Sequence, residues 1–252
     1  MSSVADVFHN HAQRDFGASG FREVELEIRT GRHTLYKYDV GHVWQRRMGE
    51  SRSLFCVTAP RILAGTSLLM VERPGKEELT IALRLRGSPD VLRVDPSRCM
   101  DAVLGSDFTY EDLRFWLPVQ TLGEPCVSTC DIDGRESLTV AGVRRTNFGV
   151  SQRLRVSLDA EHWNVVEAEW RTLVTGDLVR AYRATSHLRR SGIVTPQRVT
   201  VDGAAHGYCS EMSLIRIAVG IAIDSTALTE DAFGSIDYLE AMATWRRTAE
   251  VV

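Results

Sequence analysis

The sequence LGSDFTYEDL occupies residues 104–113, near the middle of the chain, and interrupts a long series of strand-like segments. Its Gly-Ser-Asp opening is typical of a turn, and we expect Ser106 or Asp107 to cap a short helix that follows. The two acidic residues near the end of the stretch then fall in the first helical turns, where negative charge suits the helix dipole. The stretch therefore predicts a helical insert at 105–117.

Apolar and polar residues alternate on both sides of this insert, with the period of two that is typical of β-strands. The cleanest example is 77–86, where leucine and isoleucine alternate with charged and polar residues. About ten or eleven such segments are joined by short turns, which favours antiparallel hairpins. We expect Gly41 to lie in one of these turns and residues 87–96 to form a loop. The alternation requires a sheet with one buried face and one wetter face.

Helical spacing of apolar residues appears near both ends of the chain. It predicts a helix within residues 1–20 and another at 236–250. No repeat, linker or boundary divides the chain, so we expect a single domain over 1–252. The expected fold class is mainly β: a strongly curved antiparallel sheet with a few helices, which could plug the open face of the curve.

Three segments carry a resemblance to a known family. Residues 105–113 are similar to the signature segment of the outer-membrane lipoprotein-sorting protein family, which is LolA-like. Residues 59–69, which read APRILAGTSLL, are similar to that family's Pro-x-x-x-x-Gly-Thr-x-Leu-Leu element. The segments VGIAI and LTEDAF, within 219–233, resemble its closing strand and terminal turn. The resemblance implies a half-barrel closed by helices, with an apolar cavity between them.

Bulky aromatic side chains are spread over many of the expected strands, and we interpret them as the wall of a ligand cavity. The alternative is that these rings simply fill the barrel. Arg61, in a loop, could meet an acyl carboxylate or Asp107, or it could be solvated. The expected partner is a hydrophobic small molecule or an acyl chain. The expected ligand-binding residues are Trp44, Phe55, Arg61, Phe108, Trp116, Trp163, Trp170 and Tyr182.

The acidic residues of the insert favour a second hypothesis, a cytoplasmic biosynthetic enzyme that uses the same cavity. Burial would raise the pKa of a carboxyl group there and suit it to acid–base chemistry, such as cyclisation or dehydration of a lipophilic intermediate. The catalytic residues would be Asp107, Tyr110, Asp112 and His187. The structural alternative is that Asp107 caps the insert and that Glu111 or Asp112 pairs with an arginine. The sequence leaves carrier and enzyme open.

The whole-chain composition bounds the other classes of function. The net charge is −3, so no basic surface indicates nucleic acid as a partner. Cys126 and Cys130 have no second pair with matching spacing, and we expect neither a metal nor a cofactor. The odd number of cysteines favours unpaired thiols in a reducing compartment. Residues 1–20 lack the apolar run of a signal peptide, and no segment has the length of a membrane span, so we expect a cytoplasmic protein.

Overall fold

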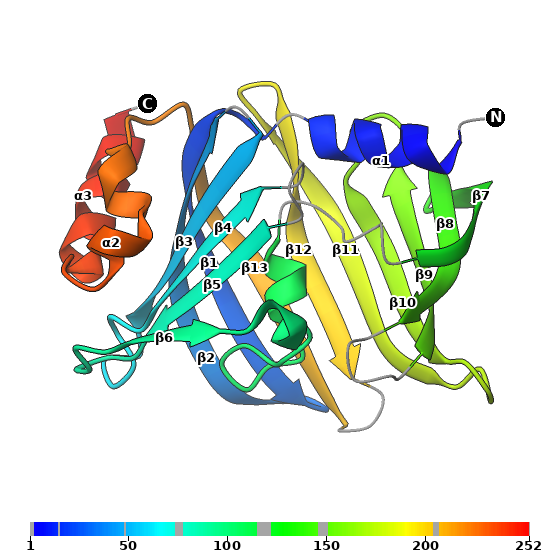
Figure 1. The fold of residues 1–252 in the computed structure, drawn as a ribbon, viewed down its shortest axis with the longest axis horizontal. Coiled ribbons are helices and arrows are strands. Elements are labelled where there is room, and N and C mark those ends of the chain that lie inside the picture. The colour runs from blue at the N-terminus through cyan, green and yellow to red at the C-terminus, as the bar shows by residue number, and fades with distance from the viewer. Residues whose placement is uncertain are drawn as a thin grey trace.

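The protein is built on one antiparallel sheet of 13 strands (Figure 1). The computed structural model describes residues 3–14, 16–47, 49–73, 78–114, 122–145, 151–203 and 207–251. The strands lie in the order β6-β5-β4-β3-β2-β1-β13-β12-β11-β10-β9-β8-β7, so the first and last strands of the chain pair at the middle of the sheet. A mainly β, curved and unclosed sheet is therefore confirmed.

The strands are β1 (Ser19–Thr30), β2 (His33–Arg47), β3 (Glu50–Ala59), β4 (Ser67–Arg73), β5 (Glu78–Arg84), β6 (Val91–Val94), β7 (Leu122–Ile132), β8 (Arg135–Arg145), β9 (Ser151–Asp159), β10 (Val165–Thr172), β11 (Leu178–Arg190), β12 (Ile193–Gly203) and β13 (Tyr208–Val219). The α-helices are α1 (Val4–Gln13), α2 (Glu230–Phe233) and α3 (Tyr238–Val251), and the 3-10 helices are η2 (Pro96–Arg98), η3 (Tyr110–Leu113) and η5 (Ser225–Leu228). None of the helices in the described ranges is long and apolar enough to cross a membrane.

Gly41 lies inside a strand, and the expected turn there was wrong. Strand β2 runs through it without a break. A Cβ atom at this position would lie 2.7 Å from the Sδ atom of Met242 in α3, closer than such contacts allow. The glycine therefore permits the close approach of a helix to the strand. Strand β6, within the expected loop at 87–96, and strand β7 also went unpredicted.

The outer face of β1 to β5 and β13 is covered by the C-terminal helices, which lie at the left of Figure 1. Phe21 of β1 and Leu54 of β3 pack there with Phe233, Tyr238 and Trp245. Each of these side chains is buried. This layer holds the main apolar core between sheet and helices.

The inner face carries the insert and α1. Because side chains alternate along a strand, Phe55 points away from the face that holds its neighbour Leu54. Phe55 belongs to a second cluster, which includes Phe108 and Leu113 of the insert. A third cluster, around Val7 of α1, lies over β8 to β10. The inner face thus has two large apolar clusters, each covered by a different segment, and a smaller one around Trp44 and Ile217.

The insert contains only one 3-10 turn in its described part, η3, and its expected cap was wrong. The N-cap is Thr109, whose backbone N–H and hydroxyl donate to Oδ2 of Asp112 at 2.7 and 2.9 Å. Ser106 instead donates its hydroxyl to the carbonyl of Val103 at 2.6 Å. Asp107 is held by strand β13, a tertiary contact that local sequence does not reveal. The end of the expected insert, 115–117, lies outside the described residues.

Candidate functional site

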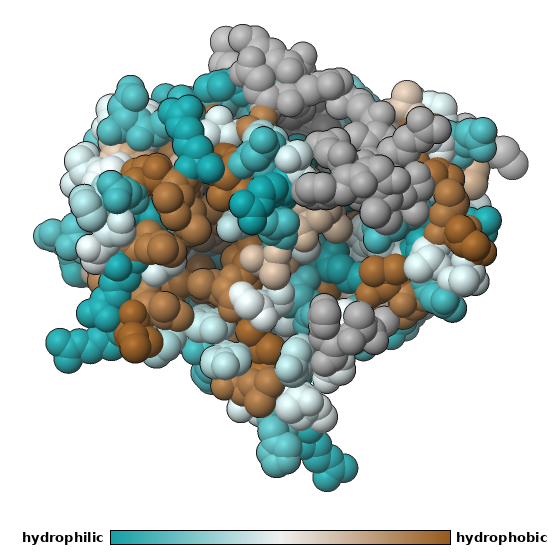
Figure 2. Space-filling view, turned by 60° about the horizontal axis from the view of Figure 1, so that its bottom comes forward, coloured by the Kyte–Doolittle hydropathy of each residue, from teal (hydrophilic) through white to brown (hydrophobic). Residues whose placement is uncertain are grey.

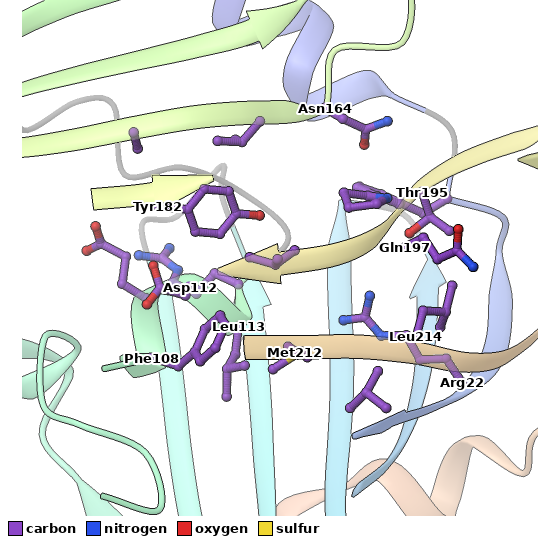
Figure 3. A pocket seen from close by; sticks show the side chains of 18 of the residues that line it. Arg22, Phe108, Asp112, Leu113, Asn164, Tyr182, Thr195, Gln197, Met212 and Leu214 are labelled. Atoms are coloured by element: carbon purple, nitrogen blue, oxygen red, sulfur yellow. The ribbon is translucent and has the colours of Figure 1, made fainter. Parts of the chain in front are cut away.

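A cavity of about 150 Å³ lies on the inner face between its two large apolar clusters (Figure 3). It combines apolar walls with several charged and polar groups. The lining residues come from the N-terminal segment, the insert, and strands β1, β10, β11, β12 and β13. This volume is below the 300–1,000 Å³ that is usual for pockets that take drug-sized ligands. The apolar lining includes Val24, Phe108, Leu113, Trp170, Met212 and Leu214, and the polar lining includes Arg14, Arg22, Asp112, Tyr182, Thr195 and Gln197.

Ion pairs tie the insert to the sheet beside this cavity. Glu111 forms a two-pronged, buried pair with Arg144 of β8. Asp112 pairs with Arg180 of β11, and both side chains are buried. Buried charges are stable only when they are paired and hydrogen-bonded in this way. These two acidic residues therefore anchor the insert.

Arg180 also links the insert to an aromatic ring of the cavity. Its Nε donates to the backbone carbonyl of Asp107 at 3.1 Å. Its guanidinium carbon lies 4.3 Å from the ring centroid of Trp170, a cation–π contact. The Asp107 carboxylate in turn accepts a 2.8 Å hydrogen bond from the hydroxyl of Ser210 on β13. The insert is thus fixed to the inner face at two strands, β11 through Arg180 and β13 through Ser210.

The structure does not bring the four expected catalytic residues together. Asp112 lines the cavity; burial raises the pKa of its carboxyl group, and Arg180 opposes that rise. Asp107 and Tyr110 lie in the insert but outside the cavity lining, and burial raises the pKa of Tyr110. His187 lines a second, separate pocket beside Arg135, and burial with that positive charge lowers its pKa.

The expected ligand-binding residues divide into three groups. Phe108, Trp170 and Tyr182 line the cavity. Arg61 is exposed in its loop, and Trp116 lies outside the described residues. The other three lie away from the cavity lining, buried or half-buried in the apolar clusters: Trp44, Phe55 and Trp163.

Arg22 is a charged residue of the cavity lining that the sequence did not predict. It lies on β1 with the same parity as Val24, Leu26 and Ile28, which are buried apolar residues of the inner face. A charged residue in register with an apolar series was the signal that could have found it. In Figure 3 its side chain extends from β1 into the cavity.

His42 holds one side of the Arg22 guanidinium. The two residues are direct cross-strand partners on β1 and β2. The Nε of Arg22 donates to Nδ1 of His42 at 2.7 Å. The imidazole ring stacks on Phe55, with centroids 4.0 Å apart and planes 3° from parallel. Burial keeps the pKa of His42 well below its usual value, so this ring is a neutral acceptor.

Tyr182 brings a hydroxyl group into the same space. Burial and the nearby Asp112 raise the pKa of Tyr182, while Arg14, Arg22 and Arg180 lower it by less. The phenol therefore stays protonated at neutral pH and acts as a hydrogen-bond donor.

The surface outside the cavity is mixed in character. Figure 2 shows apolar areas interleaved with hydrophilic residues on the face toward the viewer.

Comparison with known proteins gives the family and the fold. A family model described as "-like: Uncharacterized protein" matches residues 49–234 of this chain. The chain belongs to this family. A comparison with curated protein sequences finds no match.

Solved structures with the same fold include a domain of an outer membrane lipoprotein-sorting protein from Vibrio parahaemolyticus. It is 14% identical with a TM-score of 0.79, over 90% of this chain and 97% of that one. A DUF1329 family protein from Desulfovibrio piger is 16% identical with a TM-score of 0.77, over 90% and 96%. A LolA superfamily protein from Nitrosomonas europaea is 15% identical with a TM-score of 0.63, over 92% and 99%. The LolA-like fold is therefore confirmed.

Proposed function

We propose that this protein binds a small hydrophobic or amphipathic molecule, such as one end of an acyl chain, in the inner-face cavity. The observation that carries the proposal is the wall of that cavity. Val24, Met212 and Leu214 form an apolar surface beside a few polar groups. Such a combination is typical of sites for organic ligands, in which apolar contacts give affinity and polar groups give orientation.

The size of the cavity and the fold of the protein narrow the ligand class. A cavity of about 150 Å³ is comparable to one that holds a benzene molecule. We therefore expect a short ligand, or the end of a longer one that extends out of the cavity. One structural neighbour described as a lipoprotein-sorting protein domain and another described as a LolA superfamily protein share the fold. That likeness supports a hydrophobic ligand by analogy alone.

Two neighbouring residues on β13 provide a matched test. Leu214 lines the cavity, whereas Ile215 lies at a bulge of the strand and is 63% exposed. We expect Leu214→Trp to fill the cavity and Ile215→Trp to leave it open. Titration calorimetry with octanamide, a neutral amphipathic molecule, should show saturable binding to the wild type and to Ile215→Trp, and none to Leu214→Trp. Equal binding to all three proteins, or to none, would overturn the proposal.

The enzyme hypothesis and the cytoplasmic location stay predictions. Asp112 is the expected catalytic carboxylate that lines the cavity, and it is paired with Arg180. A search for turnover with Asp112→Asn as the control would test the hypothesis, provided that the variant remains folded.

A further inference from the structure

We infer that the ligand of this cavity is an amphipathic carboxylic acid, whose carboxylate binds the terminal nitrogens of Arg22. In this arrangement His42 is a positioning residue, and Tyr182 donates a further hydrogen bond to the carboxylate. The inference rests on the proposed function, because it names the class of molecule that the same cavity takes. Three features of the described residues carry it: the open edge of Arg22, the local balance of charge, and the fixed orientation of the guanidinium.

The open edge of Arg22 faces the cavity. Its Nε is occupied by His42. Among the residues that the structure describes, neither terminal nitrogen of Arg22 has a hydrogen-bond partner, and neither is sealed from the cavity. A guanidinium edge with two parallel N–H donors matches the two oxygens of a carboxylate.

The carboxylates beside the cavity are already engaged by other arginines. Glu111 pairs with Arg144, and Asp112 pairs with Arg180. No carboxylate in the described part of the chain stabilises the charge of Arg22, and burial lowers its pKa to about 10. A cation without an anion in a half-buried site is unfavourable, and an acidic ligand would supply the missing charge.

Arg114, the third arginine of the cavity wall, is also engaged. Its Nε donates to Glu72 of β4 at 3.0 Å. Arg14 of the N-terminal segment donates to the carbonyl of His11 at 2.6 Å and lies over the ring of Phe16. Arg22 therefore differs from its neighbours in having a donor edge for a ligand.

His42 fixes the direction of that edge. Its ring is buried and stacked on Phe55, so it cannot rotate freely. Because Nδ1 accepts from Nε of Arg22, the guanidinium plane is held and its other two nitrogens are directed away from the histidine. Preorganisation of this kind lowers the cost of ordering a side chain when the ligand binds. Leu214 and Met212 lie beside the guanidinium in Figure 3 and would contact the apolar tail.

A matched pair of ligands tests the inference. Octanoate and octanamide have nearly the same shape, but only octanoate carries a charge. Titration calorimetry at pH 7.5 should show octanoate binding the wild type about tenfold or more tightly than octanamide. In Arg22→Gln the two ligands should bind within about threefold of one another, because the charge preference is lost. Arg183→Gln is the control, since Arg183 on β11 is exposed and outside the cavity lining.

The outcomes of this titration separate the inference from the proposed function on which it rests. Equal binding of octanoate and octanamide to the wild type would overturn the inference and leave the proposed function standing. Failure of both ligands to bind would overturn both. An unchanged preference in Arg22→Gln would remove Arg22 from the site. If that variant does not fold, Arg22→Lys replaces it; it keeps the charge but loses the paired donors, and should reduce the preference.

The positioning role of His42 has a separate readout. His42→Phe keeps the stacking on Phe55 but removes the acceptor for Arg22. We expect this variant to bind octanamide as the wild type does and octanoate about threefold or more weakly. His42→Asn, which restores an acceptor atom near the position of Nδ1, should recover part of the preference. A parallel loss of both ligands in His42→Phe would indicate a structural role only.

Discussion

Both faces of the sheet carry buried side chains, but in different ways. On the outer face, Phe21 and Leu54 meet Phe233 and Tyr238 in an apolar layer, and the hydroxyl of Tyr238 donates to the carbonyl of Ala227 at 2.9 Å. On the inner face, two large apolar clusters are separated by arginines and carboxylates around a cavity. An apolar core stabilises a fold most efficiently, so the charges of the inner face are the feature on which the proposed binding site is based.

The largest effect is expected from a change on the outer face. Phe233 is fully buried between α2, α3 and the sheet. Replacing it with alanine should lower the free energy of unfolding by roughly 3–5 kcal/mol through lost contacts and a cavity. Urea unfolding measures this, and octanamide affinity of the folded variant should not change. A loss below about 1 kcal/mol would show that the outer face is not the main core.

The next largest effect is expected where the insert is anchored on the inner face. In Arg144→Met the buried carboxylate of Glu111 loses its partner, which should lower the free energy of unfolding by about 3 kcal/mol. Adding Glu111→Gln should recover most of that loss, because the unpaired charge is removed. Urea unfolding of the single and double variants gives the coupling. Simple additivity of the two changes would contradict the pairing.

An intermediate effect is expected when the pH is lowered. Burial lowers the pKa of His11 and His42 in the folded protein, while the unfolded chain keeps ordinary values near 6.5. Below about pH 6.5 the unfolded state therefore binds more protons, and stability falls as the pH falls. Each histidine should contribute up to about 1.4 kcal/mol per pH unit. Unfolding of His42→Asn between pH 7.5 and 5.5 should show a smaller slope; an equal slope would exclude His42 as a cause.

The smallest effect, with the opposite sign, is expected at Arg22. Removing a buried charge that lacks an anion should stabilise the protein, so Arg22→Gln should raise the free energy of unfolding by about 1 kcal/mol. Phe233→Ala on the outer face is expected to lower the free energy of unfolding, so the two variants should change stability in opposite directions. Thermal and urea unfolding without ligand measure it. A loss above about 1 kcal/mol would mean that the hydrogen bond from Arg22 to His42 outweighs the cost of burying its charge.

The sequence predicted most of the sheet, but not all of its strands. Alternation of apolar and polar residues in the sequence identified β5. The expected wet face was wrong there, because Ile81 and Ala82 are both buried, one against each apolar cluster. Strand β7 is mostly exposed along its length and contains Pro125, so it lacks that alternation. The prediction at Gly41 failed because the helix that packs closely against it lies about 200 residues further along the chain.

The lining of the cavity was predicted only in part, because strand pairing brings together residues that lie far apart in the sequence. Phe108, Asp112, Trp170 and Tyr182 were expected from residue type, and all four line the cavity. Gln197 and Leu214 reach the same space because β12 and β13 pair beside β1, which only the fold establishes. Arg22 was not predicted. Its position in an apolar series could have revealed it, but the orientation of its guanidinium depends on His42 of the next strand.

The central claim is that the ligand binds at the inner face and not at the outer one. Trp170 lines the inner cavity and Trp245 belongs to the outer core, so their indole N–H signals report on the two faces. The chain has five tryptophans, and Trp170→Phe and Trp245→Phe assign these two signals in a heteronuclear NMR spectrum. On titration with octanoate we expect the Trp170 signal to move to saturation while the Trp245 signal stays in place. Movement of the Trp245 signal alone, or of neither signal, would contradict the account.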